Sequence, residues 1–274
     1  MTGLPAETAV GRVALRVGDI DGLVEFYSTV VGLDVQHRTG DRAVVGAGGD
    51  PLVELHAAPD APARGQAAGL FHTAVRVPSR GALGAALARI EDGWRLTGAS
   101  DHHVSEALYL RDPEDNGVEV YCDRPREEWP ERGGRVEMDT LPLDREDLRE
   151  AADPDGASVP EGTDVGHVHL EVTDMAAARE FYVETVGLNV RQAWDGALFV
   201  AAGEYHHHVG LNTWNGRTEP AGGPGIEWFE LRVPAGALGA ARDRLDDADI
   251  EVADADGGLA VRDPDAIGVR LRPV

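Results

Sequence analysis

The first candidates for chemistry are histidines that interrupt an internal repeat. Residues 11–35 align without gaps on residues 166–190, sharing G-x-V-x-L-x-V-x-D, E-F-Y and V-G-L-x-V. Where the first copy has Arg12 and Ala14, the second has His167 and His169. Imidazole is a common metal ligand and can transfer protons near neutral pH. These mismatches therefore indicate a site that one copy carries and the other lacks.

The elements that position these residues occur four times. Residues 76–87 resemble 232–242, and 108–120 resemble 259–271, so the chain reads as four modules in two pairs. Each pair opens with period-two alternation typical of a strand, followed by helical spacing from an Asp N-cap to a Gly stop, and then by short β-rich runs. Residues two apart on a strand share a face, so His167 and His169 are expected to point the same way.

Several motifs resemble one known superfamily. These are FY-x-x-x-x-G-[LF] after the first helix, D-P-x-x-N-G-x-E at the last strand, GLFHTAVRVPSR and YHHHVGLNTW. Together they resemble the vicinal oxygen chelate superfamily, and within it the bacterial catechol 2,3-dioxygenase proteins with two such domains. The resemblance implies an α+β fold of four βαβββ modules in two tandem domains that form half-barrel cups. The expected boundaries are 1–122 for the first domain, with modules 11–58 and 70–122; 123–164 for an acidic linker with a short helix; and 165–274 for the second domain, with modules 165–215 and 225–274.

The resemblance also implies where a metal would bind. Members of the superfamily carry ligands on the first and last strands of a module. The second module supplies His72 and Glu119 at these positions, and the third supplies His167, with Gly210 where a fourth ligand would stand. If modules 2 and 3 share a barrel, His72, His167 and Glu119 form a two-histidine, one-carboxylate triad that suits Fe(II). Pairing modules 1 and 2 instead places Arg12 at a ligand position and keeps Glu54 as a rival ligand.

Further polar residues match family positions for catalysis. The resemblance implies a catalytic histidine on the strand before Gly210, and we expect His206 and His208 to face the same side as that glycine, with His207 on the other. A family tyrosine ten residues before the glutamate ligand corresponds to Tyr109. The loop from Asp101 adds His102 and His103 near another active-site histidine of the family. The expected catalytic set is His208, His206, Tyr109 and His102.

The implied reaction is extradiol ring cleavage. Fe(II), with Mn(II) as a substitute, would bind an aromatic diol, and O2 would be inserted next to the diol of the catechol-type substrate. Two other classes stay open. A glyoxalase-like lyase or isomerase would typically use four ligands on a metal that does not change oxidation state. A metal-free protein that binds an aromatic compound would need no histidine at the ligand positions.

Composition limits the partners. The chain has 274 residues, a formal net charge of −24, and 25 basic residues, all of them Arg. A surface of this charge repels nucleic acids and anionic membranes, and the spread of acidic residues indicates a halophilic protein. Cys122 is the only cysteine, so no intrachain disulfide forms. With no signal segment or membrane span evident, we expect a cytoplasmic protein, and the resemblance implies a homo-oligomer.

Overall fold

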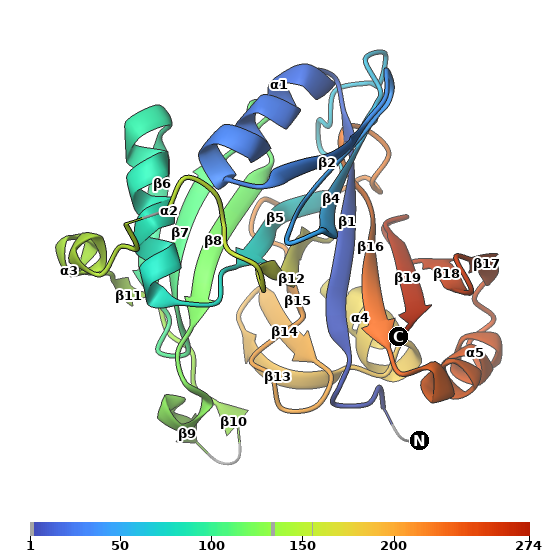
Figure 1. Cartoon of the computed structure of the whole chain (residues 1–274). Helices are drawn as coiled ribbons and strands as arrows, with labels where there is room; N and C mark the ends of the chain where they lie inside the picture. Colours follow the sequence, from blue (N-terminus) through green and yellow to red (C-terminus); the bar gives the residue numbers. More distant parts are fainter. Residues whose placement is uncertain (1–2, 133–134, 155) are drawn as a thin grey trace. The chain divides into compact units, whose positions relative to one another are not determined.

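The computed structural model describes residues 3–132, 135–154 and 156–274. The fold is α+β, as predicted, with two large sheets and few helices (Figure 1). The chain divides into two compact units. Unit 1 comprises Met1–Ala14, Pro62–Phe71 and His167–Val274; unit 2 comprises Leu15–Ala61 and His72–Gly166.

The nine-stranded sheet contains the strands of the second and third modules. Within a module, the first strand is parallel to the last, as in the pairings of β5 with β8 and of β12 with β15. In the hydrogen-bonded strand order, no strand of module 1 is a neighbour of a strand of module 2 among the described residues. In that order the strands are β11 (Leu141–Pro142), β6 (Leu96–Asp101), β7 (Ser105–Arg111), β8 (Gly117–Asp123), β5 (Gly69–Arg76), β12 (Asp164–Glu171), β15 (Val209–Asn212), β14 (Ala197–Ala201) and β13 (Asn189–Trp194).

The eight-stranded sheet contains the strands of the first and fourth modules. Here too a first and a last strand are parallel neighbours, as β16 and β19 show. A separate two-stranded sheet is formed by β10 (Arg135–Val136) and β9 (Glu131–Arg132). The eight strands in order are β17 (Ala253–Ala255), β18 (Gly258–Arg262), β19 (Gly268–Pro273), β16 (Gly225–Val233), β1 (Ala9–Val17), β4 (Asp50–Ala57), β3 (Arg42–Ala47) and β2 (Asp34–Arg38).

The repeated helices confirm the predicted Asp start and Gly stop. Asp19 accepts a hydrogen bond from the Gly22 N–H and starts α1 (Ile20–Phe26), which continues as the π-helix η1 (Tyr27–Val31) to the left-handed Gly32. In the second half α4 (Met175–Arg179) continues as η3 (Glu180–Thr185). The sequence did not predict that these helices would end in π-helical turns. The remaining helices are α2 (Arg80–Gly93), η2 (Arg126–Glu128), α3 (Arg145–Glu150), η4 (Ala235–Ala237) and α5 (Leu238–Asp247).

The short helix expected between the halves is α3, which lies beside α2 (Figure 1). The Asp144 carboxylate starts it by accepting the N–H groups of Glu146 and Asp147. Gly84 on α2 permits the close approach, because a Cβ there would lie 2.5 Å from the Leu148 carbonyl oxygen. The acidic segment is therefore partly packed structure and not only a tether.

Buried aspartates organise the turns before β8 and β19. Asp112 accepts the N–H groups of Glu114 and Asn116, and Asp263 accepts those of Asp265 and Ile267. Tyr182 also donates its hydroxyl to Asp263 at 2.8 Å. Burial raises the pKa of Asp112 to about 6 and that of Asp263 to about 7. These carboxylates serve the turns, so we assign them no chemistry.

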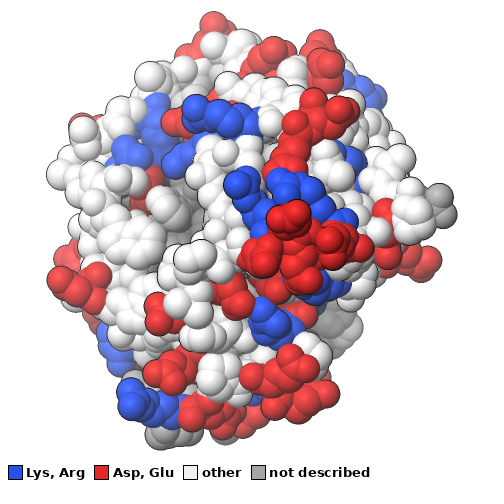
Figure 2. Space-filling view, turned by 90° about the vertical axis from the view of Figure 1, so that its left-hand side faces the viewer, with Lys and Arg blue, Asp and Glu red and all other residues white. Residues whose placement is uncertain are grey.

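Charges of both signs mix on the surface. On the face in Figure 2, Arg side chains lie among Asp and Glu side chains. The surface charges also form ion pairs, such as that of Arg149 with Glu91 at 2.7 Å. None of the helices within the described residues combines the length and the apolar character needed to cross a membrane.

Candidate functional site

Two of the predicted ligands meet in unit 2. Ala74 on β5 pairs with Glu119 on the parallel strand β8, and His72 lies two residues before Ala74 on the same face. The Nε2 atom of His72 is 3.0 Å from a carboxylate oxygen of Glu119. Both side chains are buried, with 6% and 2% exposure. A desolvated imidazole and carboxylate in contact are a suitable donor pair for a divalent cation.

Tyr109 and His102 adjoin this pair. Tyr109 on β7 lies directly opposite Glu119 in the antiparallel pairing with β8, and its ring centroid is 5.8 Å from that of His72. Its hydroxyl is 2.7 Å from Nε2 of His102, whose Nδ1 is 2.6 Å from the Asp139 carbonyl oxygen. Because a carbonyl only accepts, Nδ1 of His102 carries a proton. Burial and then the negative charge of Glu119 raise the pKa of Tyr109 well above its ordinary value, so the phenol remains protonated.

In unit 1, His167 is buried on β12 and contacts a histidine that sequence reasoning set aside. The ring centroids of His167 and His207 are 4.1 Å apart, and that of His206 is 6.1 Å from His167. Nδ1 of His206 and Nδ1 of His207 are 2.8 Å apart. His208 instead stacks on Tyr205 and accepts the N–H of Ala202 at 3.2 Å.

The expected strand alternation at residues 206–208 is wrong. The strand β15 begins only at Val209, so the three histidines lie in the turn before it, where side chains do not alternate between two faces. His207 therefore reaches His167, although a regular strand would have turned it to the opposite side. The run of three identical residues offered no signal to show where the strand began.

The glycine at the fourth family position makes room for His169. These two residues are paired on the parallel strands β12 and β15. A Cβ at position 210 would lie 2.9 Å from Cγ of His169. The Nε2 atom of His169 is 3.0 Å from Nδ2 of Asn212, which fixes the ring. Position 210 offers no ligand, and an imidazole occupies the space beside it.

In the first module the corresponding carboxylate forms an ion pair, and in the fourth module the corresponding arginine packs on an aromatic ring. Glu54, the rival ligand, is 2.6 Å from Arg42 and 2.7 Å from Nε2 of His56. Burial favours a raised pKa, but hydrogen bonds from His56 and Arg42 outweigh it and lower the pKa of Glu54 to about 2. In unit 1, the Arg270 guanidinium lies 3.7 Å from the centroid of the Trp228 ring.

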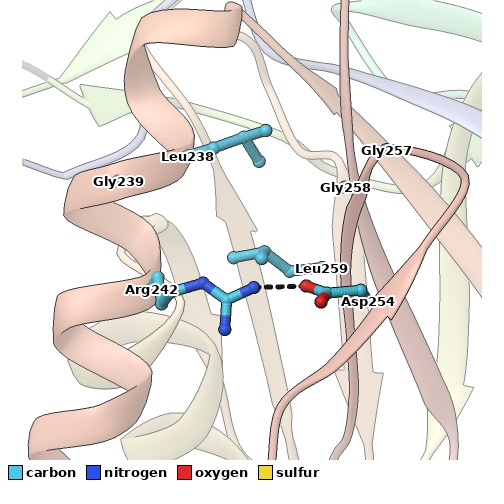
Figure 3. A pocket seen from close by; sticks show the side chains of 7 residues that line it. All are labelled: Leu238, Gly239, Arg242, Asp254, Gly257, Gly258 and Leu259. Atoms are coloured by element: carbon cyan, nitrogen blue, oxygen red, sulfur yellow. Dashed lines mark hydrogen bonds and ion pairs between the residues drawn. The ribbon is translucent and has the colours of Figure 1, made fainter.

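A surface pocket of about 380 Å³ lies between α5 and the β17–β18 hairpin (Figure 3). Its charged residues, Arg242 and Asp254, form an ion pair with each other. The seven lining residues include no histidine and one carboxylate, which is an unsuitable donor set for a catalytic metal. We assign this pocket no role.

The family model described as "Glyoxalase/Bleomycin resistance protein/Dioxygenase superfamily" matches residues 9–120 and 164–269. The chain belongs to this superfamily. It is 37% identical over 276 residues to a catechol-2,3-dioxygenase of Bacillus subtilis (strain 168), covering 96% of each chain.

Two solved structures share the fold. A putative dioxygenase from Bacillus subtilis subsp. subtilis str. 168 superposes with a TM-score of 0.64 at 14% identity, covering 100% of this chain and 86% of that one. Glyoxalase I from Zea mays superposes with a TM-score of 0.59 at 15% identity, covering 97% and 92%. A putative dioxygenase and a glyoxalase thus share this fold, so the fold alone does not choose between the two activities.

Proposed function

We propose that this chain is an extradiol dioxygenase that inserts O2 next to the diol of a catechol-type substrate. The observation that carries the proposal is the buried His72–Glu119 pair, located at the family's ligand positions in a chain similar to a catechol-2,3-dioxygenase over nearly its whole length. Fold likeness alone would support a glyoxalase equally well.

We further propose that His72, Glu119 and His167 hold the metal. Each is buried and offers one ligand atom. His72 and Glu119 lie on the parallel neighbours β5 and β8, and His167 lies on β12. Two imidazole nitrogens and one carboxylate are the donor set of non-haem Fe(II) oxygenases, and the same donors accept Mn(II). Gly210 supplies no side-chain ligand, so coordination positions remain for substrate and O2.

When bound, Fe(II) would supply coordination for both diol oxygens and O2 and the electron transfer between them. The chain's own residues would hold and transfer the protons. Tyr109, protonated and within hydrogen-bonding distance of His102, is suited to donate a hydrogen bond toward a substrate oxygen. His206 and His207 lie against His167 and are suited to hold the proton that assists O–O cleavage. His208, occupied by Tyr205 and Ala202, is a less suitable acid.

The reaction class is tested by oxygen uptake. The protein is loaded with Fe(II) anaerobically in high-salt buffer, mixed with catechol, and then exposed to O2. We expect one O2 consumed per catechol and a yellow ring-opened product. Turnover of a substrate without O2 would support a lyase or isomerase. Tight binding of catechol with no metal and no turnover would support the binding-protein alternative.

His208→Ala and Tyr109→Phe assign the roles in the same assay. Tyr109→Phe keeps the ring and removes the hydroxyl, so we expect unchanged metal content and a lower rate. His208→Ala is the matched control, because its contacts are with Tyr205 and Ala202, and we expect it to lose less activity than His206→Ala or His207→Ala. Equal losses in all three histidine variants would contradict the assignment.

A further inference from the structure

A continuous series of aromatic rings runs from His167 to the surface of unit 1. Ring centroids are 4.1 Å apart for His167 and His207, 5.1 Å for His207 and Phe199, 5.6 Å for Phe199 and His169, and 5.4 Å for His169 and Trp214. Three of these separations lie within the range of about 4.5–7 Å typical of packed aromatic pairs, and the first is slightly shorter. This series of ring contacts connects His167, a proposed metal ligand, with Trp214.

The series of rings ends in an exposed residue, Trp214. His169 and Phe199 have 3% and 6% exposure, whereas Trp214 has 49%. Trp194, with 41% exposure, packs its ring 5.1 Å from Phe199, and Phe71 lies 5.4 Å from Trp214. Large aromatic side chains grouped at the surface beside a site indicate a surface that covers an apolar ligand group.

A buried carboxylate fixes the loop that carries Trp214. Glu171 lies on β12 two residues after His169, on the same face, and is 2% exposed. It accepts hydrogen bonds from Asn215, from Arg64, and from Nε and Nη2 of Arg217 at 3.1 and 2.9 Å. These three donors come from two loops, residues 62–68 and 213–219, which Glu171 therefore ties to the strand.

Hydrogen bonds that involve backbone groups also hold these two loops together. Arg217 donates from Nη1 to the Gly65 carbonyl oxygen at 3.0 Å, and the Glu219 carbonyl oxygen accepts the N–H of Ala68 at 2.7 Å. The Trp214 N–H donates to the Asn212 side chain, whose amide also contacts His169. The backbone of Trp214 is therefore tied beside His169, and the indole lies edge-on to the imidazole.

We propose that Trp214 is a substrate-specificity residue that contacts an apolar substituent on the catechol ring, and that Glu171 is the positioning residue that holds its loop. This inference rests on the proposed dioxygenase function. An uncharged substituent fits best, because Phe71, Phe199, Trp194 and Trp214 offer ring surface. The nearby cations Arg64 and Arg217 are committed to Glu171.

The test compares binding of catechol with that of catechols carrying a tert-butyl group at ring position 3 or 4. Dissociation constants are measured calorimetrically, without O2, on the Fe(II)-loaded protein. We expect at least one substituted catechol to bind about tenfold more tightly than catechol, because burying part of the tert-butyl group, equivalent to roughly two CH₂ groups at about 0.8 kcal/mol each, corresponds to that ratio. Trp214→Ala should reduce this preference to about twofold and should leave catechol affinity nearly unchanged.

Trp94→Ala is the matched control. Trp94 has 39% exposure and packs against Phe26 in unit 2, with its indole N–H bonded to the Arg111 carbonyl oxygen. The Trp94→Ala variant should keep the full preference for the substituted catechol over catechol. If Trp214→Ala also keeps it while catechol still binds and is cleaved, the inference is wrong and the proposed function stands. If no catechol binds the loaded protein, the proposed function itself is wrong. A change of oligomeric state in Trp214→Ala with unchanged preference would identify a subunit contact and overturn the inference.

Glu171 is tested by Glu171→Gln, and by the milder Asn215→Ala in case the first variant folds poorly. Both should lower the preference for the substituted catechol, and both should speed tryptic cleavage after Arg217, located by mass spectrometry. Glu171→Asp, which retains the charge, should restore part of the preference. Faster cleavage with an unchanged preference would show that the tie is structural only.

Discussion

Glu54 gives a prediction that also decides which carboxylate serves the metal. It is buried between His56 and Arg42, and its pKa is lowered from 4.5 to about 2. A carboxylate with a lowered pKa in the folded state stabilises the fold above pH 4.5, and this contribution is lost as the pH falls from 4.5 toward 2. Removing the charge should therefore cost stability near neutral pH and little at pH 2–3.

The size of the effect follows from the same contacts. A pKa lowered from 4.5 to about 2 corresponds to at most about 3 kcal/mol. Arg42 is half exposed, with 46% side-chain exposure, so solvent screening reduces the expected value to about 1–2 kcal/mol. We expect Glu54→Gln to lower the free energy of unfolding by this amount at pH 7.

The assay is urea unfolding of the wild type and Glu54→Gln at several pH values between 3 and 7, with metal content measured in parallel. The difference in unfolding free energy should shrink as the pH falls, and Fe(II) content should not change. Glu119→Gln is the control that should lose metal. If Glu54→Gln loses metal as Glu119→Gln does, Glu54 serves the metal and our ligand set is wrong.

Three further predictions concern individual side chains. Gly210→Ala should destabilise the fold by about 1–3 kcal/mol in thermal unfolding, because the new Cβ would lie 2.9 Å from the His169 ring; an unchanged melting temperature would contradict this packing. Asp263 has a raised pKa of about 7, so its contribution to stability falls as pH rises from about 4 through 7. Asp263→Asn should accordingly gain stability relative to the wild type over that interval, and a constant difference would refute the pKa assignment. Asp144→Ala should cost about 1 kcal/mol by removing the N-cap of α3, measured by urea unfolding at pH 7, and no loss would show that α3 depends on its packing alone.

The duplication made much of the fold predictable. Helix starts at Asp19 and Asp174, the stop at Gly32 and the helix within 123–164 all follow from local backbone chemistry, which sequence displays directly. The family spacing singled out Tyr109, and the antiparallel register of β7 and β8 shows that it lies opposite Glu119.

The remaining features depend on tertiary structure. The start of β15 at Val209 is set by its pairing with β12 and β14. The three histidines before it therefore do not follow the predicted strand alternation. The tie of two loops by Glu171 joins Arg64 to residues more than a hundred positions later, and no local pattern indicates such a contact. The contact between Trp214 and His169 likewise depends on the fold, and no local pattern in the sequence indicates it.

The measurement that tests the central claim most directly is the identity of the product from a single turnover under ¹⁸O₂. The Fe(II)-loaded protein is mixed anaerobically with catechol, exposed to the labelled gas, quenched at once and analysed by mass spectrometry beside Glu119→Gln. We predict a ring-opened semialdehyde that carries ¹⁸O from the wild type and none from the variant. An unlabelled product, or a dicarboxylate opened between the two diol carbons, would contradict extradiol cleavage at this site.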